Sequence, residues 1–417
     1  MVRKLKIIAF DFKGFREALH RQAELLKERS GGKYEVEFEF IPSYEKLYEK
    51  MIKEGGVFSG EYDVFLCLTD WIPELIRKKG LTPLNDFIEE KPPEGWPNVW
   101  SRSLLSLQVD AEGRLYGFPY HNGPIILMYR KDLLEDPEEK LKFKEKFGKP
   151  LKVPETWSEF LEVAKFFTRP EEDLYGTVLA AYPDGHMNVY DFLLHLWTRG
   201  GELLDENYNP VFNSPEGEEA LTFYADLIWK HEVAPKKSLE LNTHGAGRFY
   251  LEGNAALVWQ WAGFACMAEI PEYSKVVGKT GYALVPRGDK GKHTTVNVYW
   301  VLTIPAGSQE KEGAYEFLLA AASKLGDKLT TEAGAIGTRL STWRDEEIQS
   351  RWPFYRIMEK VHENAKSPPQ IPEYHEINEK LNEMVDNVVK LRKTPREALD
   401  ETAEEVRRIL ESAGYYR

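Results

Sequence analysis

The sequence contains little cysteine, and its two cysteines suggest neither a disulfide framework nor a metal site. Cys67 and Cys266 are the only 2 cysteines among 417 residues, and they lie far apart without metal-type spacing. Each occurs in an apolar stretch, so buried free thiols are favoured over a disulfide, which stays the alternative. Glutamine is also scarce while lysine and glutamate are abundant, the direction that hyperthermophile composition takes.

Long apolar runs are missing as well. No segment approaches the roughly 20 consecutive apolar residues that a transmembrane helix needs. The chain starts basic and then apolar, but Asp11 ends the apolar run too early for a signal peptide, so we expect a first strand there. If the protein is exported, we expect its leader and any lipid-anchored cysteine to have been removed from this sequence.

An excess of positive charge is absent. The chain has 55 lysines and arginines against 68 aspartates and glutamates, a net charge of −13 that is spread along the sequence. Nucleic-acid binding needs a concentrated basic footprint, so we expect no nucleic-acid partner. The same charge gives no reason to expect attachment to an anionic membrane surface.

Recognised catalytic motifs are also lacking. There is no Gly-x-Ser-x-Gly elbow, no His-Glu-x-x-His and no phosphate loop, and His244-Gly245-Ala246-Gly247 lacks the strand and lysine of a nucleotide site. A glycoside hydrolase would need two carboxylates on either side of the scissile bond. The acidic residues mostly fall on predicted solvent-facing helix faces, which makes a hydrolase the weaker alternative, and we expect no enzyme activity.

What the sequence does contain begins with alternating strands and helices. Because 417 residues exceed the usual size of one compact core, we expect two domains. The β-α-β-α-β-α order predicts a parallel sheet with right-handed crossovers. The expected elements are strands at Lys6–Phe10, Tyr34–Ile41 and Val64–Leu68, and helices at Phe15–Arg29, Ser43–Lys53 and Trp71–Lys79.

Each of these strands is followed by an aromatic residue beside a polar one. Ligands of open α/β sheets bind beyond the carboxyl ends of the strands. Here those ends carry Asp11-Phe12, Ser43-Tyr44 and Thr69-Asp70-Trp71. The pattern predicts a binding surface at this edge of the sheet without requiring any motif.

The middle of the chain contains turns and helix starts. Gly117–Pro124 has two prolines and flanking glycines, which predicts a bend or a crossing between lobes. Thr156 and Glu159 form a capping box at the start of a helix. Asp205–Asn209 is typical of a hairpin turn; it resembles part of a calcium loop but lacks the central glycine and the closing glutamate. We therefore expect no metal and no other cofactor.

Several motifs occur in an order and spacing that together are specific. They are Tyr62–Phe65 with Trp71, Gly113–Tyr120 leading to Tyr129–Leu133, Pro154–Phe160, Gly200–Glu202, Phe249–Trp261, Gly337–Arg339 with Ser341, Pro372–Tyr374 and Thr394–Leu399. In these motifs the sequence resembles the family 1 extracellular solute-binding proteins of ABC sugar importers, the group that includes maltose-, trehalose- and glycerol-phosphate-binding proteins. The resemblance runs over essentially the whole chain.

The resemblance implies an α/β, two-lobed periplasmic-binding-protein fold of the type II kind. Each lobe is expected to be a mostly parallel sheet flanked by helices, with the ligand cleft at the hinge. The N-terminal lobe is expected to comprise residues 1–120 and 296–335, and the C-terminal lobe residues 121–295 and 336–417.

The function that the resemblance implies is binding without catalysis. A neutral carbohydrate, from mono- to oligosaccharide, would bind in the cleft, the hinge would close, and permease subunits of an ABC importer would recognise the loaded form. The expected location is extracytoplasmic, either periplasmic or anchored at the cell surface, and the expected state is a monomer. A receptor that passes its loaded state to a membrane sensor is a further alternative.

An anionic solute, such as a sugar phosphate or sugar acid, is the alternative class of ligand. That ligand would need converging cations, for which only Arg339, Lys13 and Arg199 are candidates. The chain departs from the family at Asn297-Val298-Tyr299-Trp300, where the family often has Gly-Gly. The larger side chains are expected to crowd the cleft and to favour a small or tightly enclosed ligand.

Candidate contact residues follow from the chemistry of sugars, whose apolar C–H faces are ringed by hydroxyls. Aromatic rings would stack on those faces, and fixed polar groups would hydrogen-bond the hydroxyls. The aromatic candidates are Phe12, Tyr44, Trp71, Tyr120, Trp261, Tyr299 and Trp300. The polar candidates are Asp70, His121, Asn122, Asn297 and Arg339. Structural roles are the alternatives: core packing for the tryptophans, helix capping for Asp70, a salt bridge for Arg339 and a bend for His121.

Overall fold

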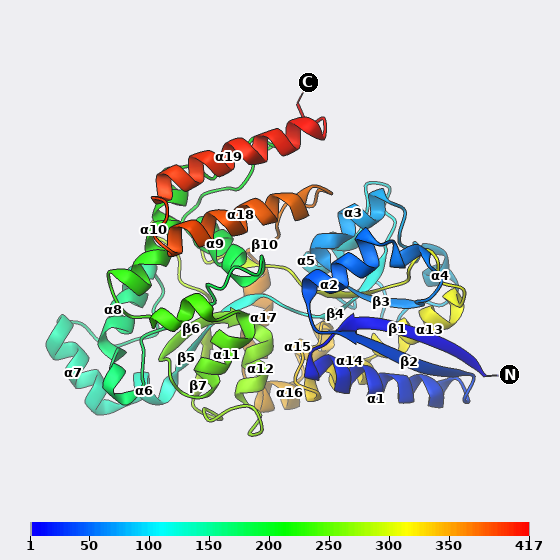
Figure 1. The fold of residues 1–417 in the computed structure, drawn as a ribbon. Coiled ribbons are helices and arrows are strands. Elements are labelled where there is room, and N and C mark those ends of the chain that lie inside the picture. Colours follow the sequence, from blue (N-terminus) through cyan, green and yellow to red (C-terminus); the bar gives the residue numbers. More distant parts are fainter. Residues whose placement is uncertain (1, 417) are drawn as a thin grey trace. The chain divides into compact units, whose positions relative to one another are not determined.

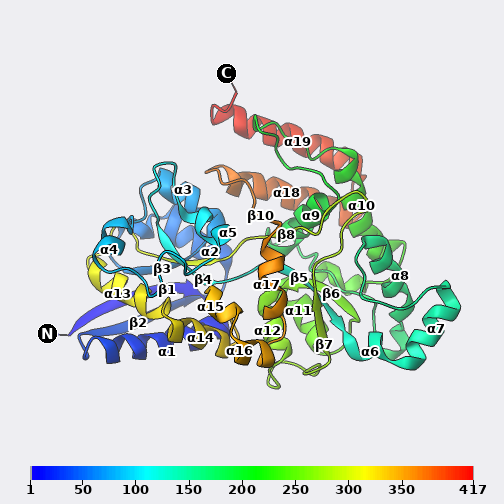
Figure 2. The same cartoon turned by 180° about the vertical axis from the view of Figure 1, so that it is seen from behind.

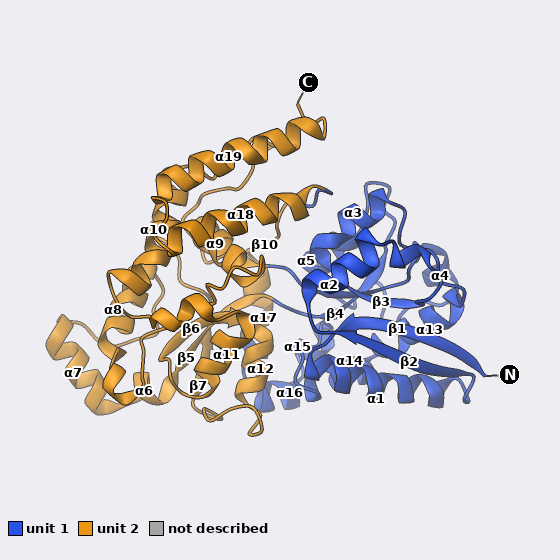
Figure 3. Ribbon diagram, viewed as in Figure 1, with its two compact units in different colours: residues 1–123, 297–356, 370–372 blue, residues 124–296, 357–369, 373–417 orange. Residues whose placement is uncertain are grey.

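The computed structural model describes residues 2–416, which divide into two compact units (Figure 3). Unit 1 contains the chain up to residue 123 together with 297–356 and 370–372; unit 2 contains 124–296, 357–369 and the chain from 373. The expected boundaries at 120/121 and 295/296 lie within three residues of these. Residues 336–356, however, were expected in the second lobe and belong to unit 1. The reason is Asp327, whose carboxylate accepts hydrogen bonds from the backbone of Thr338 at 2.8 Å and from the hydroxyl of Thr342 at 2.6 Å.

Unit 1 is built on a five-stranded sheet in the order β2-β1-β3-β9-β4. The strands are β1 (Arg3–Phe10), β2 (Tyr34–Ile41), β3 (Val64–Leu68), β4 (Gly117–His121) and β9 (Trp300–Thr303). β1 pairs in parallel with both β2 and β3, while β9 runs antiparallel to its neighbours β3 and β4. Four of the five strands therefore run in one direction, and the predicted mostly parallel sheet is confirmed for this unit.

Helices cover both faces of this sheet, with α1 and α14 on one side and α2 and α3 on the other (Figures 1 and 2). The helices of unit 1 are α1 (Lys13–Arg29), α2 (Tyr44–Tyr48), α3 (Ile72–Arg77), α4 (Asn85–Glu90), α5 (Arg102–Leu105), α13 (Lys311–Ala321), α14 (Lys324–Glu332), α15 (Leu340–Trp343) and α16 (Glu346–Arg351). α17 (Tyr355–His362) crosses from unit 1 into unit 2.

Local sequence explains most of these boundaries. Ser43 caps α2 by accepting from the backbone of Lys46, and the helix continues as a π-helical turn over Glu49–Lys53. The helix expected at Trp71–Lys79 begins at Ile72 instead, because Thr69–Trp71 forms a 3-10 turn and Trp71, not Asp70, takes the N-cap position.

The predicted bend at Gly117–Pro124 is wrong for its first half, since Gly117–His121 is strand β4. β9 approaches this strand so closely that a Cβ atom on Gly117 would lie 2.4 Å from the Val301 side chain and 2.7 Å from the Leu302 carbonyl oxygen. The glycine is thus required by sheet packing and not by a turn. The chain passes from unit 1 to unit 2 directly afterwards, between residues 123 and 124.

Unit 2 contains a three-stranded sheet in the order β6-β5-β7. Its strands are β5 (Ile125–Arg130), β6 (Leu257–Trp261) and β7 (Thr280–Ala283), and a short parallel pair joins β8 (Thr295–Val296) to β10 (Ala365–Lys366). β5 is antiparallel to both of its neighbours, so the prediction of a mostly parallel sheet is wrong for this unit. The prediction extended the βα alternation of residues 1–80 to a segment where β6 and β7 return against β5. Parallel pairing in the described part of unit 2 consists of the short β8–β10 pair and isolated bridges such as Tyr175 with Ala255.

Most of the regular secondary structure of unit 2 is helical (Figure 1). They are α6 (Lys131–Glu135), α7 (Pro137–Phe147), α8 (Trp157–Phe167), α9 (Met187–Thr198), α10 (Pro215–Trp229), α11 (Thr243–Leu251), α12 (Ala262–Ala268), α18 (Tyr374–Val389) and α19 (Pro395–Ser412). The predicted capping box at Thr156 and Glu159 is present, and Thr394 with Glu397 forms a second one. No helix within residues 2–416 is both long enough and apolar enough to cross a membrane. Cys67 and Cys266 are both buried, and neither takes part in a disulfide within residues 2–416.

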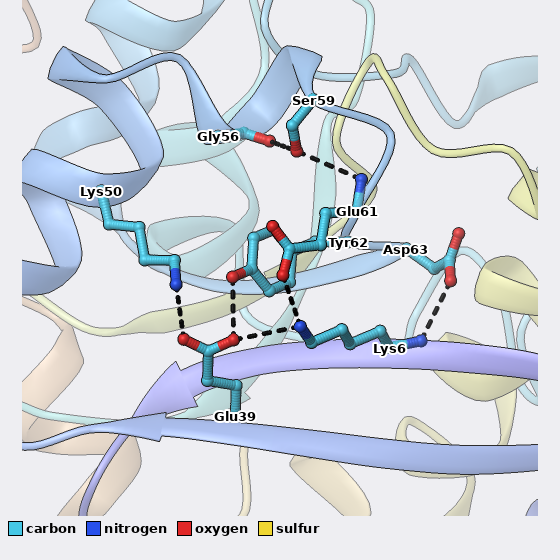
Figure 4. Close-up of polar contacts among 8 residues, drawn as sticks. All are labelled: Lys6, Glu39, Lys50, Gly56, Ser59, Glu61, Tyr62 and Asp63. Carbon is cyan, nitrogen blue, oxygen red and sulfur yellow. Dashed lines mark hydrogen bonds and ion pairs between the residues drawn. The ribbon is translucent and has the colours of Figure 1, made fainter.

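A polar network joins β1, β2 and the turn after α2 in unit 1 (Figure 4). The Glu39 carboxylate accepts from Lys50 Nζ at 2.6 Å and from the Tyr62 hydroxyl at 2.8 Å, and it lies 3.2 Å from Lys6 Nζ. Burial alone would raise the pKa of Glu39, but these three hydrogen bonds outweigh it and lower that pKa. The network therefore stabilises the folded state when Glu39 is ionised.

We expect Glu39→Gln to lower the free energy of unfolding at pH 7 by about 1 kcal/mol, allowing for partial exposure. Because the folded pKa of Glu39 is lowered, its stabilisation is present above the unfolded pKa and is lost as the pH falls through the folded value. The deficit of the variant should thus shrink between pH 6 and about pH 3 in urea titrations. Glu37→Gln, on the same strand with its side chain 58% exposed and paired with exposed Lys4, is the control and should lower stability much less. Equal effects of the two substitutions would contradict the role of the network.

Candidate functional site

The carboxyl ends of the parallel strands in unit 1 meet at one edge of the sheet. Register places Leu68 of β3 opposite Trp300 of β9, and Trp300 opposite His121 of β4. Phe10 of β1 pairs with Ile41 at the end of β2. His121 ends β4, and the segments that follow the strand ends carry the predicted residues Phe12, Tyr44, Asp70, Trp71 and Asn122. Sheet topology therefore brings these predicted residues together with Trp300.

Aromatic rings pack against one another along this edge. Phe10 stacks on Tyr44 with centroids 4.1 Å apart and planes 12° apart, and on Trp300 at 5.6 Å and 15°. Trp71 meets Trp300 edge-on at 6.3 Å. We call Phe10, Phe12, Tyr44, Trp71 and Trp300 the unit 1 aromatic surface. The mutual packing of Phe10, Tyr44, Trp71 and Trp300 fixes these four rings before any ligand arrives, which reduces the entropy lost on binding. Phe12 joins the surface through His121, whose ring lies 6.3 Å from its own.

His121 and Asn122 are held beside this surface by the backbone of Ile336. His121 Nδ1 accepts from the Ile336 N–H at 2.9 Å, and the Asn122 N–H donates to the Ile336 carbonyl at 3.1 Å. Burial lowers the pKa of His121 to about 3, so the ring is neutral at physiological pH. Since Nδ1 is an acceptor, the proton is on Nε2, and His121 presents a neutral donor.

Four predicted contact residues are bonded or packed within unit 1 instead. The Tyr299 hydroxyl donates to the Leu104 carbonyl, and Tyr120 packs edge-on against Phe15 at 5.9 Å. Asn297 Nδ2 donates to the Ser103 carbonyl at 2.8 Å. Arg339, which is 2% exposed, donates to the backbone carbonyls of Glu94 and Ala322. These partners give Tyr120, Asn297, Tyr299 and Arg339 structural roles within unit 1, so we build the site without them, and their contact with a ligand stays a prediction.

A second aromatic group surrounds Trp261 in unit 2. Trp261 ends β6, and its ring lies 5.6 Å from that of His186 and 5.3 Å from that of Tyr190. His186 Nδ1 is hydrogen-bonded to the Thr243 hydroxyl at 3.1 Å. We call His186, Tyr190 and Trp261 the unit 2 aromatic surface. It lies where α9 and α11 begin.

The polar groups of the unit 2 aromatic surface are neutral or lack a partner. Desolvation by the surrounding protein, with a smaller effect of His244, lowers the pKa of His186 to about 3. Trp261 is 8% exposed, and its indole Nε1 has no hydrogen-bond acceptor within residues 2–416. A buried donor without an acceptor costs about 1–3 kcal/mol, which a ligand oxygen would relieve. This surface therefore combines a flat ring with an unsatisfied neutral donor.

Comparison with known proteins identifies the family of the chain. Residues 13–334 match the sequence profile described as bacterial extracellular solute-binding protein, which is well over half of the chain. The chain belongs to this family. As predicted, this is a family of binding proteins and not of enzymes.

Relatives of this solute-binding protein include the mannitol-binding protein of Pseudomonas aeruginosa, 26% identical over 74% of this chain and 72% of the relative. Among solved structures, the maltose-bound MalE3 protein of T. maritima is 26% identical, with a TM-score of 0.85 over 98% of this chain and 100% of the other. An ABC transporter solute-binding protein of Agrobacterium radiobacter K84 in complex with ribitol is also 26% identical, with a TM-score of 0.84 over 97% and 98%. These matches confirm the predicted fold class.

The loop that carries His186 in this solute-binding protein is fastened to α18. Asn382 Oδ1 accepts from the backbone of Gly185 at 3.1 Å and from Asn188 Nδ2 at 2.6 Å. Asn378 Nδ2 donates to the Gly185 carbonyl at 2.7 Å, and Asn382 Nδ2 donates to that of Pro183 at 3.3 Å. The two asparagines position residues 182–186, and with them the ring of His186 beside Trp261.

His186, Tyr190 and Phe10 belong to these surfaces and were not predicted as site residues. Phe10 was recognised only as the last residue of a strand. His186 and Tyr190 lie at a helix start far from Trp261 in sequence, and no local spacing links them to it. The only sequence signal was the turn-forming Pro183-Asp184-Gly185 before a helix.

We expect Asn382→Ala to loosen the 182–186 loop while leaving the fold intact. Loss of the acceptor for the Gly185 N–H should speed amide exchange of this loop about tenfold, the equivalent of about 1.4 kcal/mol. Hydrogen–deuterium exchange with mass spectrometry of the peptide that covers the loop measures this. Asn387→Ala on the same helix is the control, because its side chain makes only a 3.5 Å contact with Arg392. Unchanged exchange in Asn382→Ala would show that the asparagines do not hold the loop.

Proposed function

We propose that this chain is the extracytoplasmic substrate-binding protein of an ABC importer and that its ligand is a neutral carbohydrate, a sugar or polyol of one to a few units. The observation that carries the proposal is the unit 2 aromatic surface, where Trp261 combines a flat ring with a buried, unpartnered Nε1 donor. Relatives support it, since those named above are a mannitol-binding protein and proteins solved with maltose and with ribitol.

The proposed contacts follow from the chemistry of each group. Trp261 stacks on a C–H face of the ligand and donates from Nε1 to an oxygen, while neutral His121 donates from Nε2. Phe12, Tyr44, Trp71 and Trp300 supply apolar contact, and Asp70 and Asn122 supply polar contact from the carboxyl edge of the unit 1 sheet. Closure of the two units around the ligand stays a prediction.

An anionic ligand is the second candidate, and the structure weighs against it. Arg199 donates to Glu219 at 3.0 Å and lies over the rings of Trp157 and Phe223. Arg339 donates to two backbone carbonyls, and Lys13 lies 3.9 Å from Glu17. The three cations that could have held a sugar phosphate or sugar acid are therefore engaged elsewhere.

The remaining details belong to the same proposal. The bulky Trp300 packs on Phe10 at 5.6 Å, which favours a small ligand over a long oligosaccharide. Family membership supports a location outside the cytoplasm, and we propose a periplasmic or surface-anchored monomer that delivers its ligand to permease subunits.

The experiment is a thermal-shift screen of ligand-stripped protein against neutral saccharides, polyols, sugar acids and sugar phosphates. A ligand at a hundred times its Kd should stabilise the protein by about 2.7 kcal/mol. We expect a shift with a neutral sugar or polyol. Trp261→Ala should weaken that ligand by about 2 kcal/mol or more, roughly 30-fold in Kd.

Trp229→Ala serves as the control, since the Trp229 indole donates to the Val389 carbonyl outside both surfaces. It should lower stability without changing the ligand-induced shift. Shifts only with anionic solutes would replace the neutral ligand by the second candidate, and consumption of any sugar would refute the binding role.

A further inference from the structure

A pocket in unit 2, apart from the two aromatic surfaces, gathers positive charge. It has a volume of about 310 Å³ and lies between the loop of residues 284–293 and the end of α17. Arg287 and Lys292 line the pocket from the loop, and Lys360 lines it from α17. Glu363 is the only carboxylate in its lining, so the pocket carries a net positive charge in a chain of net charge −13.

These three cations make no ion pair among the residues that the structure describes. Elsewhere in unit 2, Arg169 lies 2.6 Å from Glu139 and Lys149 lies 2.5 Å from Glu162. Arg287, Lys292 and Lys360 have no carboxylate oxygen within 4.0 Å among the residues that the structure describes, although Glu363 lines the same pocket. Like charges that share a pocket repel one another, and a bound anion would remove that repulsion.

The backbone around Arg287 fixes one side of the pocket. The Arg287 N–H donates to the Glu155 carbonyl at 3.0 Å, and the Arg287 carbonyl accepts from the Trp157 N–H at 3.0 Å. Its Nη1 also reaches the carbonyls of Gly288 and Asp289 at 3.3 Å each. The guanidinium is thus placed by the fold, while Lys292 and Lys360 are exposed and can adjust to a ligand.

We propose that this pocket binds a small polyvalent oxyanion bearing phosphate groups, at a site separate from the carbohydrate. The planar guanidinium of Arg287 can donate two parallel hydrogen bonds to one phosphate group. The ammonium groups of Lys292 and Lys360 add compact positive charges that attract its other oxygens. The volume is at the small end of ligand pockets, about 300–1,000 Å³, which suits an inorganic phosphate or a single phosphate-bearing group. A free phosphate compound and the headgroup of an anionic lipid share this chemistry.

The test is titration of the full-length protein with pyrophosphate at low salt, followed by isothermal titration calorimetry. Lys292→Ala combined with Lys360→Ala should weaken binding at least tenfold. The matched control is Lys237→Ala combined with Lys275→Ala, which removes the same charge from two exposed lysines of unit 2 outside the pocket. The control should bind pyrophosphate within twofold of the parent protein.

Co-sedimentation with phosphatidylglycerol and phosphatidylcholine vesicles separates the two sources of phosphate. Pyrophosphate binding together with retention on phosphatidylglycerol, both lost in the pocket variant, assigns the site to a lipid headgroup. Pyrophosphate binding without retention assigns it to a soluble phosphate. No pyrophosphate binding, or equal binding by the pocket variant, overturns the proposal. The thermal shift with a neutral sugar should be the same in the pocket variant, so this test is independent of the carbohydrate site.

Discussion

The antiparallel pairing of β9 between β3 and β4 is the constraint on which the arrangement of unit 1 depends. β9 comes from residues 300–303, far along the chain from the other strands, and it completes the sheet by pairing with both. Its register puts Trp300 opposite both Leu68 and His121, at the edge where the parallel strands end. A shift of one residue would turn Trp300 to the other face and separate it from Phe10 and Tyr44. The unit 1 aromatic surface therefore depends on backbone pairing as much as on its own side chains.

Unit 2 depends on a buried carboxyl group in a comparable way. Asp191 in the middle of α9 accepts from the Tyr224 hydroxyl and from Trp259 Nε1, each at 2.7 Å. Burial raises its pKa to about 7, and the two hydrogen bonds only partly oppose that effect. Trp259 lies two residues before Trp261 on β6, so the same bonds tie the strand that carries Trp261 to the helix that carries Tyr190. α9, β6 and the two asparagines of α18 together hold the unit 2 aromatic surface in place.

Local patterns in the sequence were enough to predict much of this molecule. The alternation at Tyr34–Ile41 and the apolar run at Val64–Leu68 gave strands with the observed ends, because strand periodicity is a property of neighbouring residues. The positions of Tyr44 and Trp71 just after strand ends predicted that they lie at the same edge of the sheet, because parallel strands end along one edge. The antiparallel sheet of unit 2 was not predictable from local alternation, as strand direction is decided by how distant segments return.

Some predicted contact residues have partners that residue type alone does not indicate. Arg339 and Tyr299 have donors that suit a sugar, but backbone carbonyls of Glu94, Ala322 and Leu104 accept from them inside unit 1. Conversely, His186 lay outside every motif because its partner Trp261 belongs to a distant segment. Residue type indicates what a side chain can do, and only the fold decides what it meets.

The measurement that tests the central claim most directly is isothermal titration calorimetry with mannitol, ribitol and maltose, followed by mass spectrometry of the recovered ligand. The account predicts that a neutral ligand binds once per chain, with a negative heat-capacity change from burial of aromatic surface, and is recovered unchanged. No heat with any neutral ligand, or recovery of a cleaved or modified product, would contradict it.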